Sequence, residues 1–476
     1  MMIGYLCGII GQKQWRNRKN GRGMMMNKND LITVTITDLG DKGEGIGHVD
    51  GMTVFVKKAG LGDVVEAKVI KVKKNYCIGK LENILSEGAY RINAVCPYAD
   101  RCGGCQLQHM SYEGQLLHKQ TNVVNTLKRI GGVSDVVKDA VLGMEKPEYY
   151  RNKGIFPVAL QNGKPVIGFY RQGSHDVVDI KHCMLQSRLA NRTLDAVRNG
   201  LKQTSISIYD EVKHKGYLRS VMIRTNRDET EAMVVFVTNG KVGKGLRNMI
   251  DHLSDIPEIT AVIQNVNTSK GNKVLGYENH VVIGEGSITD YINEFAFDLG
   301  PMSFFQVNPV QTGKLYAQAL AYADLKGEET VYDLYCGAGT ISLFLAKQAK
   351  EVIGIEIIPE AVEAAKENAK RNGIDNTSFY VGKAEEVFPK LYEEGKKADV
   401  VVVDPPRKGC DELLLRTIAD MKPDRIVYVS CKVSTLARDI KILEELGYET
   451  VKGQAVDMFP YTTHVENVVK LQLVNR

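Results

Sequence analysis

Two reactive side chains stand at the ends of apolar runs near the C-terminus. Cys431 closes the run RIVYVSC, and Glu466 opens the run ENVVKL just after His464. A cysteine at the tip of a strand is more often an inert core residue than a nucleophile, so its surroundings decide. Lys432 and the start of the following helix, with Ser434 as its cap, are expected to lower the pKa of the thiol. Glu466 is a candidate general base, His464 competes with it, and an ordinary surface glutamate at a strand start is the alternative.

A glycine-rich turn and two acidic residues indicate a nucleotide-type ligand. The turn, DLYCGAGT at residues 333–340, lies where a strand ends and a helix begins, so its backbone can approach a ligand closely. Glu356 ends the next strand, where a carboxylate can accept the hydroxyls of a ribose, and Asp404 ends the run VVVV. The turn lacks the third glycine of a dinucleotide site and the Lys-Ser/Thr of a P-loop, so an adenosine without phosphates fits best, which suggests S-adenosylmethionine. A tight turn with a surface Glu356, and a capping Asp404, are the alternatives.

A cluster of cysteines raises the question of a metal. Three lie within ten residues in CPYADRCGGC, and a fourth is far downstream in IKHCML. The spacing C-x5-C-x2-C with a distant fourth thiol matches iron–sulfur ligation at least as well as zinc, whose structural sites usually come as two symmetric pairs. Thiols that merely pack are the remaining alternative. The candidate ligands are Cys96, Cys102, Cys105 and Cys183, with His109 and His182 as substitutes.

Length and composition bound the class of protein. The 476 residues exceed what one hydrophobic core usually serves, so two or three domains are expected. The formal net charge of +5 permits a polyanionic partner without demanding one. No apolar run reaches the roughly 18 residues that a membrane helix needs, and the N-terminal apolar stretch precedes the basic one, unlike a secretory signal. We therefore expect a cytoplasmic protein without a membrane partner, in which nine cysteines do not indicate a disulfide framework.

The residues that could do chemistry must be positioned by elements of different kinds. Residues 1–29 carry basic charges only, which predicts a disordered basic tail. Residues 30–88 alternate β-branched runs with glycine turns, which predicts a small β-barrel. Residues 89–300 mix strands and helices, one of them from Ser111 to Ile130, and predict a central α+β domain that carries the cysteines. Residues 301–476 alternate strand and helix, which predicts a parallel sheet covered on both faces.

One strand of the expected barrel is basic. Its sequence KVIKVKKNYCIGK has no acidic residue and includes one aromatic residue, Tyr76. Lysines neutralise phosphates and a ring stacks on bases, so the strand suits a single-stranded nucleic acid. A solvated edge strand whose lysines block aggregation is an equal alternative. The lysines are Lys68, Lys71, Lys73, Lys74 and Lys80.

The chain resembles the RNA uracil-5-methyltransferases of the RumA/TrmA family over about residues 30–476. The stretches that carry the resemblance are CPYADRCGGCQLQHM, YRNKGIFPV, SFFQVNP, DLYCGAGTISLFLA, GIEIIPEAVEAAKENAKRNGI, VVVDPPRKG, VYVSCKVSTLARD and HVENVVKL. The resemblance implies an N-terminal TRAM domain (a small OB-like β-barrel), a central α+β domain with an iron–sulfur cluster, and a C-terminal α/β Rossmann-like methyltransferase domain.

The resemblance also implies roles for individual residues. Cys431 would attack C6 of a uridine, because C5 is too weak a nucleophile to take a methyl group unaided, and Glu466 would remove the C5 proton afterwards. The contacts to S-adenosylmethionine would come from Gln306, Tyr335, Glu356 and Asp404. A [4Fe–4S] cluster would be held by Cys96, Cys102, Cys105 and Cys183.

The expected partner is RNA. A chain with both the barrel and the four cysteines resembles the ribosomal-RNA branch, so we expect 23S ribosomal RNA rather than DNA, one or two target uridines, and a monomer. A tRNA uracil-5-methyltransferase is the closest rival. A cytosine-5 enzyme would carry a cysteine near Asp404, where Arg407 follows Asp-Pro-Pro. A non-catalytic RNA-binding iron–sulfur protein would have lost Cys431, Glu466 or the glycine turn, and all three are present.

Overall fold

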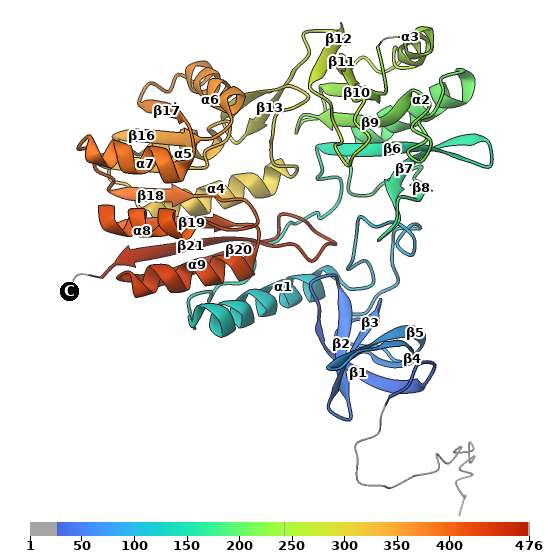
Figure 1. Ribbon diagram of the computed structural model, residues 1–476, viewed down its shortest axis with the longest axis horizontal. Coiled ribbons are helices and arrows are strands. Elements are labelled where there is room, and N and C mark those ends of the chain that lie inside the picture. The colour runs from blue at the N-terminus through green and yellow to red at the C-terminus, as the bar shows by residue number, and fades with distance from the viewer. Residues whose placement is uncertain (1–25, 242, 475–476) are drawn as a thin grey trace, which may run out of the picture.

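The computed structural model describes residues 26–241 and 243–474, so nearly all of the predicted tail 1–29 lies outside the described residues. Figure 1 shows a barrel (blue) that projects from the rest, a central sheet (green), and a larger unit of sheet and helices (orange to red). Nowhere in these described ranges is a helix long and apolar enough to cross a lipid bilayer.

The N-terminal unit is a closed five-stranded barrel, as predicted, with strand order β1-β2-β3-β5-β4. Alternate residues of β4 point inward, so that Val65, Ala67 and Val69 are completely buried while their neighbours are not. Because the barrel closes on itself, the basic strand is not an edge strand, and that alternative is wrong. The strands are β1 Leu31–Leu39, β2 Glu44–Val49, β3 Met52–Lys57, β4 Val64–Val72 and β5 Tyr76–Ser86.

The central unit is a seven-stranded mixed sheet in the order β12-β11-β10-β9-β6-β7-β8. Helix α2 (Arg188–Gln203) covers it with a stripe in which Leu194, Val197 and Leu201 are buried at helical spacing. A short helix, α3 (Lys244–Asp251), packs beside α2. The strands are β6 Lys153–Gln161, β7 Lys164–Tyr170, β8 Val177–Asp179, β9 Leu218–Thr225, β10 Ala232–Thr238, β11 Ile259–Val266 and β12 Glu278–Ile283.

The C-terminal unit, which carries the candidate catalytic residues Cys431 and Glu466, is a second seven-stranded sheet (the catalytic sheet) with helices on both faces as predicted and strand order β17-β16-β15-β18-β19-β21-β20. Strand β18 is buried at every residue, as expected of a parallel strand between two helical layers. Only β21 is reversed, since it runs antiparallel to both of its neighbours, β19 and β20. The strands are β15 Thr330–Leu334, β16 Glu351–Glu356, β17 Thr377–Val381, β18 Val400–Val403, β19 Arg425–Ser430, β20 Tyr448–Val456 and β21 Glu466–Leu473, and the helices are α4 Pro309–Ala323, α5 Thr340–Ala346, α6 Pro359–Arg371, α7 Ala384–Glu393, α8 Glu412–Met421 and α9 Val433–Glu445.

The helix expected at Ser111–Ile130 forms, and it packs on the C-terminal unit. Ser111 caps α1 (Tyr112–Thr126), whose last turn widens into the π-helix η1 (Leu127–Gly131). This π turn packs on α9 and joins the hydrophobic core on one face of the catalytic sheet. The apolar side of this helix is therefore buried against the C-terminal unit, although the helix lies far ahead of that unit in the sequence.

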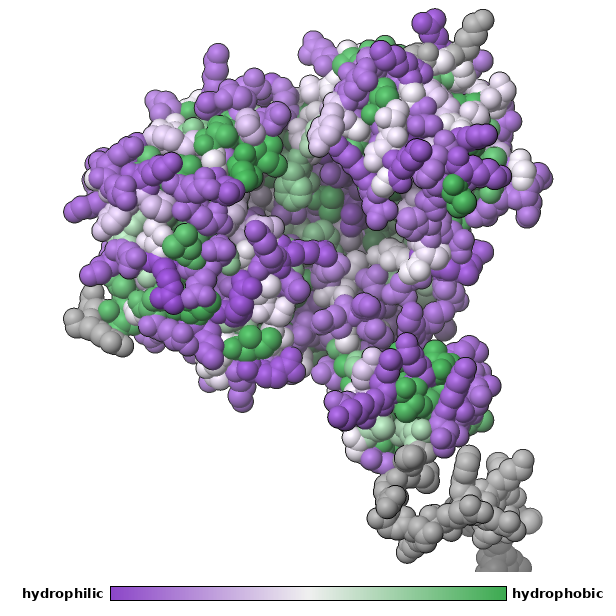
Figure 2. Space-filling model, viewed as in Figure 1, coloured by the Kyte–Doolittle hydropathy of each residue, from purple (hydrophilic) through white to green (hydrophobic). Residues whose placement is uncertain are grey.

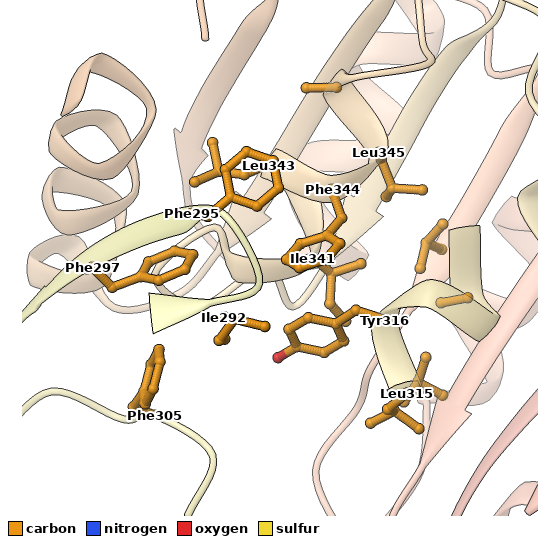
Figure 3. Packing of buried hydrophobic residues seen from close by; sticks show 14 of the residues in the cluster. Ile292, Phe295, Phe297, Phe305, Leu315, Tyr316, Ile341, Leu343, Phe344 and Leu345 are labelled. Carbon is orange, nitrogen blue, oxygen red and sulfur yellow. The ribbon is translucent and has the colours of Figure 1, made fainter. Parts of the chain in front are cut away.

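A hairpin before residue 300 also packs on the catalytic unit. It comprises β13 (Ile288–Ile292) and β14 (Phe295–Leu299). In Figure 3 Phe295 of this hairpin lies beside Leu343 and Phe344 of α5, and the rings of Phe295 and Phe344 are 4.8 Å apart. The predicted boundary at residue 300 thus cuts through a packed core.

Candidate active site

Four candidate residues lie at the carboxyl edge of the catalytic sheet. Tyr335, Glu356, Asp404 and Cys431 end or directly follow β15, β16, β18 and β19. The strand order reverses between β15 and β18, where open sheets of this kind bind ligands. In Figure 1 strand β21 points toward the chain end marked C, away from the central sheet. Strand β19 is antiparallel to β21, so β19 and the strands parallel to it end on the side that faces the central sheet. Figure 2 shows a recess between these two units, with hydrophobic residues at its floor.

Strand β21 brings the candidate base to the candidate nucleophile. Ser430 pairs with Asn467 in antiparallel register, so the next position places Cys431 opposite Glu466. Glu466 is 3% exposed, whereas Cys431 is partly exposed. Burial, followed by the charges of Glu466 and Asp404, raises the pKa of the Cys431 thiol to about 11. A thiol that a ligand can reach thus stands beside a buried carboxyl group.

Carboxyl groups are concentrated at this edge. Burial, and after it the charge of Asp404, raises the pKa of Glu466 to about 8. Burial raises the pKa of Asp404 to about 6. Burial, together with the charges of Asp404 and Glu356, raises the pKa of Asp333 to about 7. This happens although the hydroxyl of Ser342 donates a hydrogen bond of 2.5 Å to Asp333, which lowers its pKa. Buried carboxyl groups that raise one another's pKa indicate a site for a cationic ligand.

The glycine turn is tied to Glu356 and faces open space. The backbone amides of Gly337 and Ile358 donate to the two carboxylate oxygens of Glu356, at 3.2 Å and 3.0 Å. Gly339 has a φ of 78°, and a Cβ there would lie 3.0 Å from the Cβ of Ala365, so glycine is required. A Cβ at Gly337 would have no atom within 4 Å. The turn therefore presents its backbone to a cradle beside a carboxylate.

Two predicted contacts to the cofactor, Tyr335 and Gln306, form hydrogen bonds with residues away from the carboxylates at the sheet edge. The hydroxyl of Tyr335 donates to Glu385 on α7 at 3.1 Å. Gln306 lies between β14 and α4, and its carbonyl accepts a hydrogen bond from Asn152 at 3.3 Å. In the part of the chain that the structure describes, neither side chain is hydrogen-bonded to the carboxylates of the sheet edge, so both roles stay predictions.

The predicted cause of a low thiol pKa is wrong. Helix α9 begins at Val433 with Lys432 as its N-cap residue, and Ser434 lies inside its first turn instead of capping it. The cation that lowers the pKa of Cys431 is Arg407, and burial and the neighbouring carboxylates outweigh it. The thiolate is thus disfavoured in the absence of ligands.

Arg407 and Asp333 are part of this site, although no role was predicted for either of them. The charge of Arg407 lowers the pKa of Cys431 and of Glu466, and after burial it also lowers the pKa of the rival base His464. Its place directly after Asp-Pro-Pro at the edge of a sheet was the available signal. Asp333 could have been found as the acidic residue that opens the glycine turn.

The four predicted metal-ligand cysteines come together from two segments. Cys96, Cys105 and Cys183 pack against one small apolar cluster that includes Tyr461. Burial, and then the charges of Cys183 and Cys96, raises the pKa of Cys102, so this fourth thiol is near them. No group of three or more His, Cys, Asp or Glu side chains among the described residues is arranged so that it could hold a metal ion. The structure gathers the thiols without showing a metal site.

The two histidines considered as substitute ligands have other neighbours. His182 shares a hydrogen bond of 3.1 Å with the hydroxyl of Tyr149. His109 is buried, and its pKa is lowered to about 4, first by burial and then by the charge of Arg91.

Comparison with known proteins identifies the family of this chain. The model described as tRNA (Uracil-5-)-methyltransferase matches residues 111–474, and that of the TRAM domain matches residues 27–81. The chain belongs to the tRNA (uracil-5-)-methyltransferase family. This confirms the resemblance seen in the sequence, and RNA uracil-5-methyltransferase activity follows from it.

Relatives of this uracil-5-methyltransferase are similar along nearly the whole chain. A Clostridium tetani protein named an uncharacterized RNA methyltransferase is 50% identical over 443 residues, which cover 93% of this chain and 96% of that protein. A Halalkalibacterium halodurans protein of the same description is 48% identical over 451 residues, covering 94% and 98%. The crystal structure of Pyrococcus abyssi tRNA (uracil-54, C5)-methyltransferase in complex with S-adenosyl-L-homocysteine matches with a TM-score of 0.76 at 28% identity, over 92% of this chain and 100% of that one.

Proposed function

We propose that this family member methylates C5 of a uridine in 23S ribosomal RNA, using S-adenosylmethionine and a transient bond between Cys431 and C6 of the base. The observation that carries the proposal is the antiparallel pairing that sets Cys431 opposite the buried Glu466. Both lie at the sheet edge that also carries the glycine turn, so a base and a methyl donor can meet there.

In the proposed reaction the residues of the chain act one after another. Cys431 is partly exposed and loses its proton to solvent, which the charge of Arg407 favours. The sulfur then bonds to C6, and the C5–C6 π electrons shift to form an enolate. S-adenosylmethionine, when bound, supplies an electrophilic methyl group for C5. The carboxylate of Glu466 takes the C5 proton, the C5–C6 double bond re-forms, and the sulfur leaves as a thiolate.

S-adenosylmethionine fits this edge in charge and shape. Burial raises the pKa values of Asp333, Asp404 and Glu466, and the positive sulfonium and ammonium groups of the cofactor would lower them again. Glu356 stands where a ribose would bind, next to the open space in front of Gly337. Asp404, Tyr335 and Gln306 are the other proposed contacts.

The barrel supports an RNA substrate. Lys71, Lys73 and Lys74 are exposed around the β4–β5 turn, and Lys80 is exposed farther along β5. Tyr76 is 37% exposed there, and Phe55 packs edge-on against its ring with centroids 5.5 Å apart. A supported ring among lysines can stack on an unpaired base while the lysines neutralise phosphates.

The cysteines are proposed to hold a [4Fe–4S] cluster. Four free thiols lie close enough for the charge of one to raise the pKa of another, which suits a group that needs four thiolates. They are Cys96, Cys102, Cys105 and Cys183. A four-iron cluster holds its ligands farther apart than a single zinc ion does, so thiols too spread for one ion can still fit it. Four protein ligands leave no open coordination position, and the cluster would therefore serve structure rather than chemistry.

Labelled methyl transfer tests the substrate. The purified protein is incubated with labelled S-adenosylmethionine and either 23S ribosomal RNA or tRNA, and the methylated nucleotide is identified. We expect 5-methyluridine in 23S RNA. Label confined to tRNA supports the second candidate, tRNA methylation, which the printed substrate of the Pyrococcus abyssi structure favours. Label at any atom other than uridine C5 overturns the proposal.

A further inference from the structure

One loop forms hydrogen bonds with α1, with the segment that follows the clustered cysteines and with the barrel. It comprises residues 457–465 and joins β20 to β21, so it ends directly before Glu466. Val456, just before the loop, pairs with Glu466 across the two strands. The loop therefore connects the strand end that carries the proposed base to the residue opposite that base.

A buried ion pair anchors the start of this loop. Lys119 of α1 donates a hydrogen bond to Asp457, and both side chains are completely buried. The hydroxyl of Tyr112 donates to the other carboxylate oxygen at 2.8 Å, and Lys119 also donates to the carbonyl of Phe459 at 3.1 Å. A buried ion pair adds little net stability, because the loss of water offsets the attraction, but it can fix one geometry.

The segment that follows the clustered cysteines holds the middle of the loop. The carbonyl of Tyr461 accepts hydrogen bonds from the backbone amides of Gln106 and Leu107, both at 3.0 Å. Its own amide donates to the side chain of Gln115 at 2.8 Å. Tyr461 has a φ of 66°, a left-handed conformation that tyrosine rarely adopts, so the surrounding bonds must hold it there.

The barrel contacts the same loop. The hydroxyl of Thr463 donates to the carbonyl of Asp41, in the turn between β1 and β2, at 2.7 Å. In that turn a Cβ at Gly43 would lie 2.8 Å from the Cβ of Gln106, so the barrel also meets the cysteine segment closely. Two parts of the chain that are far from the catalytic sheet in sequence are thus bonded to the loop before Glu466.

We propose that the 457–465 loop is a positioning device for Glu466, with Lys119 as its anchoring residue and Thr463 as its link to the barrel. The inference rests on the proposed function, in which Glu466 acts only after methyl transfer. A displaced loop should therefore slow removal of the C5 proton more than it slows methyl transfer, because only proton removal uses the carboxylate. A residue needed merely for folding would affect both steps alike.

The test separates the two steps in single turnovers with RNA tritiated at uridine C5 and a labelled methyl donor. The double variant Lys119→Met/Asp457→Asn removes both charges and keeps the acceptor for Tyr112. We expect tritium release to slow on the order of tenfold or more while methyl transfer changes less than about threefold, and an RNA–protein adduct stable to denaturing gels to accumulate. Thr463→Val should show the same split to a smaller degree.

A matched control neutralises an exposed pair. Lys366 and Glu363 on α6 form an ion pair of 2.8 Å with exposed side chains, and Lys366→Met/Glu363→Gln should leave both rates unchanged. Equal slowing of both steps, or no slowing, overturns the positioning role. If the double variant does not fold, the same ratio measured for the partly exposed Thr463→Val decides. A wild-type protein that methylates RNA without releasing C5 tritium overturns the proposed function itself, and the role of Glu466 with it.

Discussion

Replacing Glu466 by glutamine should stabilise the ligand-free protein, and increasingly so as the pH rises. Burial, and then the charge of Asp404, raises the pKa of Glu466 from 4.5 to about 8. A carboxyl group with a raised folded-state pKa contributes stability that is fully present below the unfolded pKa and is lost as the pH rises through the folded one. At about 1.4 kcal/mol per pKa unit the whole shift corresponds to about 5 kcal/mol, of which about 2 kcal/mol develops between pH 6 and pH 8.

Thermal unfolding at pH 6, 7 and 8 without ligands measures this difference. For a catalytic domain of this size, 2 kcal/mol corresponds to about 5 °C, so the Tm advantage of Glu466→Gln should widen by about that much. Glu386→Gln is the control, because a hydrogen bond from Lys383 lowers the pKa of this exposed carboxylate, which is then ionised in both states over the range. Parallel Tm curves for wild type and Glu466→Gln would refute the argument that burial and the charge of Asp404 outweigh the charge of Arg407 at this carboxyl group.

Three further predictions concern the site. Cys431→Ala should abolish RNA methylation while changing S-adenosylmethionine affinity by less than about twofold in calorimetry, and retained methylation would contradict its role as nucleophile. Affinity for S-adenosylmethionine should rise from pH 6 to pH 8, since the pKa values of Asp404 and Asp333, about 6 and about 7, mean that carboxylates which attract the sulfonium form over this range. S-adenosylhomocysteine, whose sulfur is uncharged, should show a weaker pH dependence, and equal dependences would argue against this electrostatic origin. Anaerobically purified protein should absorb near about 400 nm and lose that band in Cys105→Ser, and a wild-type protein without the band would argue against the cluster.

The sequence predicted those elements whose burial pattern is local. Alternation along β4 and the fully apolar β18 each indicated a strand and its environment, and both are confirmed. The sequence did not show where α1 and the hairpin Ile288–Leu299 pack, because the residues of α9 and α5 that share their cores come much later in the chain. A periodic apolar face shows that a helix packs, and it does not show against what.

Residue types and motifs in the sequence by themselves determined the family, the strand ends that carry Glu356, Asp404 and Cys431, and the four cysteines as a group. Only the tertiary structure decided the charge environment of the site, in which carboxylates and burial raise the pKa of Cys431 instead of Lys432 lowering it. The ion pair between Lys119 and Asp457 is likewise a result of the tertiary structure alone, because the two residues are 338 positions apart in the sequence. The physical reason is that pKa values and positioning contacts depend on distance and burial in space, which spacing along a chain does not fix.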